Sequence, residues 1–217
     1  MMSKSQQQML IAFLSVLLFV GAAYTAIPTP KLVQPDKYWT LDVRFEHPKL
    51  LVYKPTPLSS PKRFWYTIMT VTNNTGSDAD FITDCEMLTD TLQLTAAGKS
   101  VPPAVFKLIK HRHRRHYPLL ENIEFTSQKL LEGADNARDI VIIWPDFDKK
   151  ASKVKLFVTG LSNETVAVNH PVAKDKAGKP KKIYLRKTLE LVYDVSGDAT
   201  VLSGRRLSYK SRSWIFR

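Results

Sequence analysis

Residues 38–46, YWTLDVRFE, alternate apolar and polar side chains along the whole stretch. Trp39, Leu41, Val43 and Phe45 fall on one parity, and charged or hydroxyl-bearing side chains fall on the other. A period of two is that of a β-strand with one buried face and one solvated face. The stretch therefore predicts a half-buried strand and points to a β fold.

Two further stretches are apolar on both parities. Residues 63–72 read RFWYTIMTVT and run into the turn sequence NNTG at residues 73–76, and residues 140–144 read IVIIW. Aromatic and β-branched residues suit strands, and a strand covered on both faces has no polar parity. Both stretches are therefore predicted to be interior strands.

Shorter apolar or alternating runs occupy most of the remaining chain. They predict strands at residues 81–88, 91–95, 123–126, 154–159, 183–195 and 207–216. The polar, Gly- and Pro-containing residues 175–182 predict an exposed hairpin loop. About nine short strands separated by turns indicate an all-β antiparallel sandwich of the immunoglobulin-like type.

Residues 101–116 depart from this pattern. Pro103 suits the first position of a helix, where its missing N–H costs nothing, and three apolar residues share one helical face: Val105, Leu108 and Ile109. Cations follow near the end, where the helix dipole favours them. One short helix is predicted here, with a strand as the alternative.

The N-terminal segment, residues 1–26, differs from the rest. Residues 9–20 are uncharged and apolar apart from one serine, and the small residues Gly21 and Ala23 follow. This pattern is typical of a secretory signal peptide cleaved after Ala23. The alternative is an uncleaved membrane anchor, because residues 9–26 are long enough to span a bilayer. Either interpretation places the remaining chain outside the cytoplasm, in the periplasm or secreted.

The domain boundaries follow from the same segment. Residues 27–37 contain three prolines and predict an extended linker. Residues 38–217 then form one domain. Cys85 is the only cysteine, so no internal disulfide can form and the core depends on apolar burial.

The net charge of +12 is unevenly distributed. Residues 107–116 and 205–217 each hold five Lys or Arg and no acid, and residues 174–187 hold seven with one acid, Asp175. Residues 78–90 instead hold five acids. The positive electrostatic field of the three basic segments attracts anionic partners. For an exported chain we expect anionic lipid, an envelope polymer or an acidic protein, and no nucleic acid.

Several segments resemble immunoglobulin-like β-sandwich domains of uncharacterised exported bacterial proteins. They are Val71–Thr75, Leu131–Gly133, Ile140–Asp146, Lys155–Glu164 and Trp214–Arg217. The resemblance implies an immunoglobulin-like fold and an extracytoplasmic location. It implies no catalytic residues.

The segment HRHRRH at residues 111–116 is the most conspicuous candidate site. Arg and His offer several N–H donors to phosphate or carboxylate, so a site for an anionic partner is predicted at Lys107, Lys110, Arg112, Arg114 and Arg115. Metal binding through His111, His113 and His116 is the alternative, although the neighbouring cations oppose it. If the acids of residues 78–90 paired with these cations, the charges would neutralise each other within the protein, and the hypothesis of an anionic partner would be weaker.

Two clusters of acidic residues suggest other kinds of site. The acids of residues 78–90 suggest calcium but lack the glycine of a binding loop, and Asp146 with Asp148 could act as an acid–base pair or simply form a turn. No nucleophile elbow, phosphate-binding glycine loop or His-Glu-x-x-His motif is present. The sequence therefore predicts a non-enzymatic binding or structural domain of the cell envelope without a cofactor. The alternative is an envelope enzyme or metal-binding protein that uses the His and Asp clusters.

Overall fold

A computed structural model of the chain describes residues 30–33 and 37–217. The signal or anchor segment predicted at residues 1–26 lies outside the described residues. The chain divides into two units. Residues 30–168 and 182–217 form the larger unit, called the body below, and the described part of the other is residues 169–181, called the hairpin tip.

The described residues are mostly β-strand with one α-helix. In chain order the elements are β1 (Lys31–Val33), β2 (Asp42–Phe45), β3 (Lys49–Tyr53), β4 (Lys62–Asn73), β5 (Ala79–Asp80), β6 (Cys85–Thr89), β7 (Leu94–Ala96), α2 (Pro103–His113), β8 (Glu121–Asn122), η1 (Ile123–Phe125), β9 (Lys129–Leu130), β10 (Gly133–Pro145), β11 (Lys153–Val158), β12 (Thr165–Lys174), β13 (Pro180–Gly197) and β14 (Arg205–Phe216).

The strands form two main sheets. The first sheet has the order β2-β4-β10-β8, and β3 also pairs with β4. The second has the order β1-β12-β13-β11-β6-β7, and β14 pairs with β13. Strands β5 and β9 form a separate two-stranded sheet. All pairings are antiparallel except β8 with β10.

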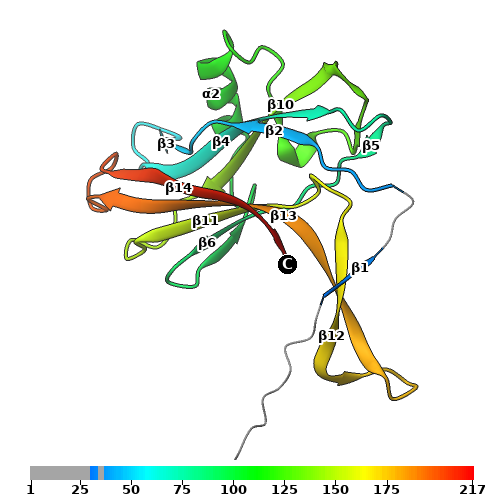
Figure 1. Ribbon diagram of the computed structural model, residues 1–217. Coiled ribbons are helices and arrows are strands. Elements are labelled where there is room, and N and C mark those ends of the chain that lie inside the picture. The colour runs from blue at the N-terminus through cyan, green and yellow to red at the C-terminus, as the bar shows by residue number, and fades with distance from the viewer. Residues whose placement is uncertain (1–29, 34–36) are drawn as a thin grey trace, which may run out of the picture. The chain divides into compact units, whose positions relative to one another are not determined.

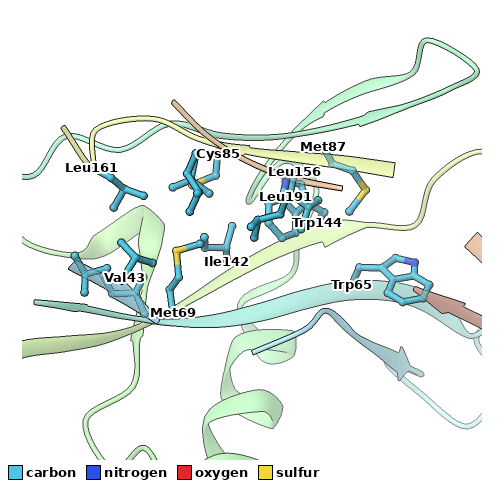
Figure 2. Packing of buried hydrophobic residues seen from close by; sticks show 14 of the residues in the cluster. Val43, Trp65, Met69, Cys85, Met87, Ile142, Trp144, Leu156, Leu161 and Leu191 are labelled. Carbon is cyan, nitrogen blue, oxygen red and sulfur yellow. The ribbon is translucent and has the colours of Figure 1, made fainter. Parts of the chain in front are cut away.

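The main hydrophobic core contains side chains from both sheets. Strands β4 and β10 contribute residues of one parity each, so Met69 and Ile140 are register partners that both enter this core. Figure 2 shows Met69 and Ile142 of the first sheet with Cys85 and Leu191 of the second in this cluster. Burial of these apolar faces is the main contribution to stability in a chain without disulfides.

The opposite face of the first sheet carries a second core. Phe64, Tyr66 and Ile68 of β4 pack there with Val105 and Ile109 of α2. In Figure 1, α2 lies beside β4 and β10, and strands β6, β11 and β13 lie on the other side of them. This explains why residues 63–72 and 140–144 have no polar parity: one face meets the second sheet, and the other is covered by the helix.

The mostly β fold, the antiparallel sheets and the single helix are therefore confirmed. Residues 123–126 were wrongly predicted as a strand, because η1 forms a 3-10 turn there, in which Asn122 Oδ1 accepts a hydrogen bond from the Glu124 backbone N–H at 3.2 Å. Strands β1, β3 and β12 are among those that were not predicted, and β1 lies within residues 27–37, which were predicted to be a linker. Prolines flank β3 in the sequence, and β12 contains one itself.

The hairpin tip joins β12 to β13. The Asp175 backbone N–H donates to the Lys179 carbonyl at 2.8 Å, and Gly178 N–H donates to the Asp175 carbonyl at 3.1 Å. Gly178 has a φ of +76°, which favours glycine. The hairpin loop predicted at residues 175–182 is present but shorter: the turn covers residues 175–179, and residues 180–182 already belong to β13. Among the described residues, no helix is long and apolar enough to cross a membrane.

Candidate functional site

The five predicted anion-binding residues lie on α2 and the turn that follows it. Val105 and Ile109 are fully buried against the first sheet, which fixes the orientation of the helix. Lys107, Lys110 and Arg112 of this helix are exposed. Arg114 and Arg115 are also exposed, and they occupy a turn in which the backbone N–H groups of residues 116 and 117 donate to the His113 carbonyl. The five residues therefore lie together on α2 and the turn after it; they are called the basic face below.

The basic face is not neutralised by nearby acids. Within residues 37–217, none of its five members forms an ion pair. Three of the five acids of residues 78–90 have other partners: Asp78 pairs with Lys129, Glu86 pairs with Arg217, and Asp90 accepts hydrogen bonds from Ser152. Within residues 37–217, none of the five acids forms an ion pair with the basic face.

Part of this charge also serves the helix itself. Lys110, His111, Arg112 and His113 occupy the last turn of α2, next to its unpaired carbonyl groups. Cations in this position interact favourably with the helix dipole, by about 0.3–1 kcal/mol each. Lys107 lies earlier in the helix, and Arg114 and Arg115 follow it, so helix stabilisation does not account for the whole face.

The three histidines of this segment do not converge. His113 is half-buried, and its Nε2 lies 3.0 Å from the Tyr66 hydroxyl. Burial and the nearby Lys49 lower the pKa of His113, against the opposing effect of Glu46. His111 and His116 are exposed. Over residues 30–33 and 37–217, no three His, Cys, Asp or Glu side chains are placed so that they could hold a metal ion.

A groove of about 530 Å³ borders the end of the basic face. Its lining comes from β2, β4, β10 and the turn after α2: Arg44, Phe45, Glu46, Ile68, Thr70, His116, Tyr117, Ala137 and Asp139. Arg44 and His116 are exposed there. Asp139 accepts a hydrogen bond from Thr70 at 2.7 Å. The groove thus carries charges of both signs and suits a polar ligand.

Glu46 is the most strongly bonded carboxylate of this groove. Its Oε1 accepts a hydrogen bond from the Tyr117 hydroxyl at 2.6 Å, and its Oε2 accepts one from Lys49 Nζ at 2.5 Å. Burial raises the pKa of Glu46, but the two hydrogen bonds and the charges of Lys49 and His113 together outweigh it, so the pKa lies below its ordinary value. The hydrogen bond to Glu46, together with burial, raises the pKa of Tyr117 to about 12. Glu46 therefore stays ionised and Tyr117 stays protonated at neutral pH, which suits positioning rather than proton transfer.

Asp146 and Asp148, the possible acid–base pair, have structural roles. Asp146 Oδ2 accepts from Arg63, and its Oδ1 accepts from Trp65 Nε1 at 2.9 Å. Asp148 Oδ1 accepts from the Lys150 backbone N–H at 2.9 Å and shapes the turn. Both oxygens of Asp146 are thus occupied, and turn formation accounts for this segment.

The three basic windows of the sequence differ in their use. In residues 205–217, Arg205 is buried against backbone carbonyls, Lys210 pairs with Asp194, and Arg217 pairs with Glu86. Three of the five cations of this segment therefore already have partners within the protein. Within the described residues, the basic face and the lysines of the hairpin tip form no ion pairs. A count of charges in the sequence does not distinguish these cations from those that are paired.

Sequence reasoning missed the groove and Arg44. The alternation in residues 38–46 places Arg44 on the polar side of β2 but does not reveal what lies beside it. That neighbour is the turn after α2, about 70 residues later in the chain. No family model matches this chain. A search of curated proteins and a search of solved structures also give no match.

Proposed function

We propose that this protein is an exported or membrane-tethered, non-enzymatic binding domain that engages an anionic partner through the basic face, Lys107, Lys110, Arg112, Arg114 and Arg115. One observation carries the proposal: five exposed cations lie on one short helix and the turn after it, and within residues 37–217 none of them forms an ion pair. Unpaired charge gathered on one surface attracts an oppositely charged surface and accelerates encounter with it.

The packing of α2 against the first sheet supports a role in binding. Val105 and Ile109 are fully buried, so α2 is held against the first sheet rather than extending into solvent. A pre-organised surface loses less conformational entropy on binding than a flexible loop does. Arg112, Arg114 and Arg115 add planar donor groups, which suit phosphate or carboxylate oxygens.

The extracytoplasmic location is part of the proposal and rests on residues 9–26. An immunoglobulin-like sandwich is also part of it. Two antiparallel sheets that share one core and the resemblance of segments such as Ile140–Asp146 support that architecture. Domains of this kind act through their surfaces, and here the conspicuous surface is basic.

The test is retention on vesicles that contain acidic lipid and on an acidic polymer, at low and at high salt. A variant with Gln at all five positions of the basic face is compared with a variant with Gln at Lys54, Lys62, Lys99, Lys149 and Lys150. These control lysines are exposed, and the control removes the same charge. We expect the first variant to bind at least about tenfold more weakly, because each cation near an anionic surface contributes about 1 kcal/mol.

The control variant is expected to retain most of the binding. Binding by the native protein should also fall at high salt, where charges are screened within a few ångströms. Salt-independent binding, no binding, or equal loss in the two variants would count against the basic face as the site.

A further inference from the structure

The hairpin tip presents lysines without neutralising them. Lys174, Lys176, Lys179 and Lys181 are exposed, and among the described residues none of them forms an ion pair. Asp175 is the one acid of this stretch. Its Oδ1 accepts hydrogen bonds from the backbone N–H groups of residues 177 and 179, both at 2.9 Å. The carboxylate is thus committed to the turn.

The tip also exposes an apolar side chain. Val172 of β12 is 81% exposed. Lysines beside exposed apolar groups are typical of surfaces that meet a lipid interface, where the ammonium groups contact headgroups and the apolar groups reach the acyl boundary.

The pairing of β1 shows where the chain enters the body. Lys31 is opposite Ala167 and Val33 is opposite Thr165, in antiparallel register. Pro30, which precedes Lys31, therefore lies at the end of this pair where Val168 follows Ala167. At that same end the chain leaves the body for the hairpin tip, which begins at residue 169.

The linker is short. Five peptide units separate Ala26, the last residue of the uncharged stretch, from Lys31. Even when fully extended, they reach at most roughly 18 Å. If residues 9–26 enter a membrane, its surface lies within this reach of Lys31, which pairs with Ala167 two residues before the hairpin tip begins.

From these observations we propose that the hairpin tip binds the acidic headgroups of the membrane that residues 9–26 span, through Lys174, Lys176, Lys179 and Lys181. The tether holds the tip at a high effective concentration near the membrane, so weak contacts suffice. Each lysine near an anionic leaflet contributes about 1 kcal/mol. The proposal shares the membrane tether with the proposed function but does not depend on the basic face of α2, which stays available for its own partner.

The test follows the tip directly in the full-length chain, reconstituted in vesicles. Ala177 is exposed in the turn, and Cys85, the only native cysteine, is buried with a raised thiol pKa, so a fluorophore can be attached selectively to an Ala177→Cys variant. Quenching by a headgroup-attached quencher is measured in phosphatidylcholine vesicles with and without phosphatidylglycerol. We expect stronger quenching with the acidic lipid, and loss of that difference at about 1 M salt, where screening acts over about 3 Å.

Two further variants separate this surface from the basic face. Substituting Gln at the four lysines of the tip should remove the acidic-lipid quenching, whereas substituting Gln at the five positions of the basic face should leave it unchanged. Equal quenching with and without acidic lipid would overturn the proposal, and so would loss caused by the basic-face variant alone. Removal of residues 1–23 from the native protein, measured by its intact mass, would also overturn it, because no tether would remain.

Discussion

The Tyr117 hydroxyl donates a hydrogen bond of 2.6 Å to Glu46 Oε1 and joins the turn after α2 to the end of β2. The two residues are 71 positions apart in the chain. Their contact fixes one wall of the groove beside the basic face. It also couples the ionisation of a carboxylate to the placement of the helix end.

Replacing Tyr117 with Phe should remove this hydrogen bond and keep the ring. We expect the free energy of unfolding to fall by at most about 1 kcal/mol, because the pair is partly solvated. The pKa of Glu46 should rise, since one of the bonds that lowers it is lost. Chemical denaturation and an NMR titration of Glu46 measure the two effects.

Tyr184→Phe is the matched control, because Tyr184 is 61% exposed and has no hydrogen bond through its hydroxyl among the described residues. It should change neither quantity. An unchanged Glu46 pKa in Tyr117→Phe would contradict the assigned role of the hydrogen bond.

His113 should make the protein less stable in mild acid. Its pKa in the folded state is lowered, first by burial and then by Lys49, so the unfolded chain binds this proton more readily. The stabilising contribution of neutral His113 is present above the unfolded-state pKa of about 6.5 and is lost as the pH falls from there through the folded-state pKa. Urea unfolding at several values between about pH 7 and pH 5 should show this loss.

In His113→Gln the same pH dependence should be weaker. Glutamine cannot titrate, and its amide oxygen can still accept from the Tyr66 hydroxyl. His111→Gln, at an exposed neighbouring position, should retain the native slope. If both variants retained it, the acid sensitivity would come from another group.

Adjacent residues of α2 should differ sharply in their importance. Ile109 is fully buried between the helix and the first sheet, and Leu108 is 45% exposed. Ile109→Ala should cost about 2–5 kcal/mol because it leaves a cavity, whereas Leu108→Ala should cost about 0.5 kcal/mol or less beyond helix propensity. Urea denaturation of the two variants measures the difference. Similar losses would mean that the helix is oriented differently from the structure.

Arg205 should be essential to the turn between β10 and β11, although its neighbour Arg206 should not. The Arg205 guanidinium is buried and donates to the carbonyls of residues 147, 148, 149 and 151. It also stacks on the Phe147 ring, 4.3 Å from the ring centre. Arg205→Gln should cost about 2 kcal/mol or more, because buried carbonyls lose their donors.

Arg206 follows on the exposed face of β14. Arg206→Gln removes the same charge, and its effect should stay within about 0.5 kcal/mol. Thermal unfolding of both variants at one pH provides the comparison. Equal destabilisation would indicate that net charge, rather than these hydrogen bonds, stabilises the protein.

The class of the fold could be predicted from local sequence patterns. The alternation in residues 38–46 and the uniformly apolar residues 140–144 are local consequences of how strand faces are buried, so a one-dimensional pattern records them. The helix at residues 103–113 could also be predicted from a local pattern, namely Pro103 and the helical spacing of Val105 and Ile109. The five cations of the basic face were also visible, because they lie within nine consecutive residues.

Which charges of the described residues form ion pairs, and which side chains lie beside them, depends on how the strands and layers pack. Arg205 and Arg206 are adjacent and chemically identical, yet one is buried in the fold and the other is exposed, because the pleat of β14 places them on opposite faces. Similarly, Arg44 lines one groove with His116 and Tyr117 only because the turn after α2 packs on the face of the first sheet that carries Arg44. Such relationships depend on strand pairing and layer packing over long stretches of chain, which local composition does not encode.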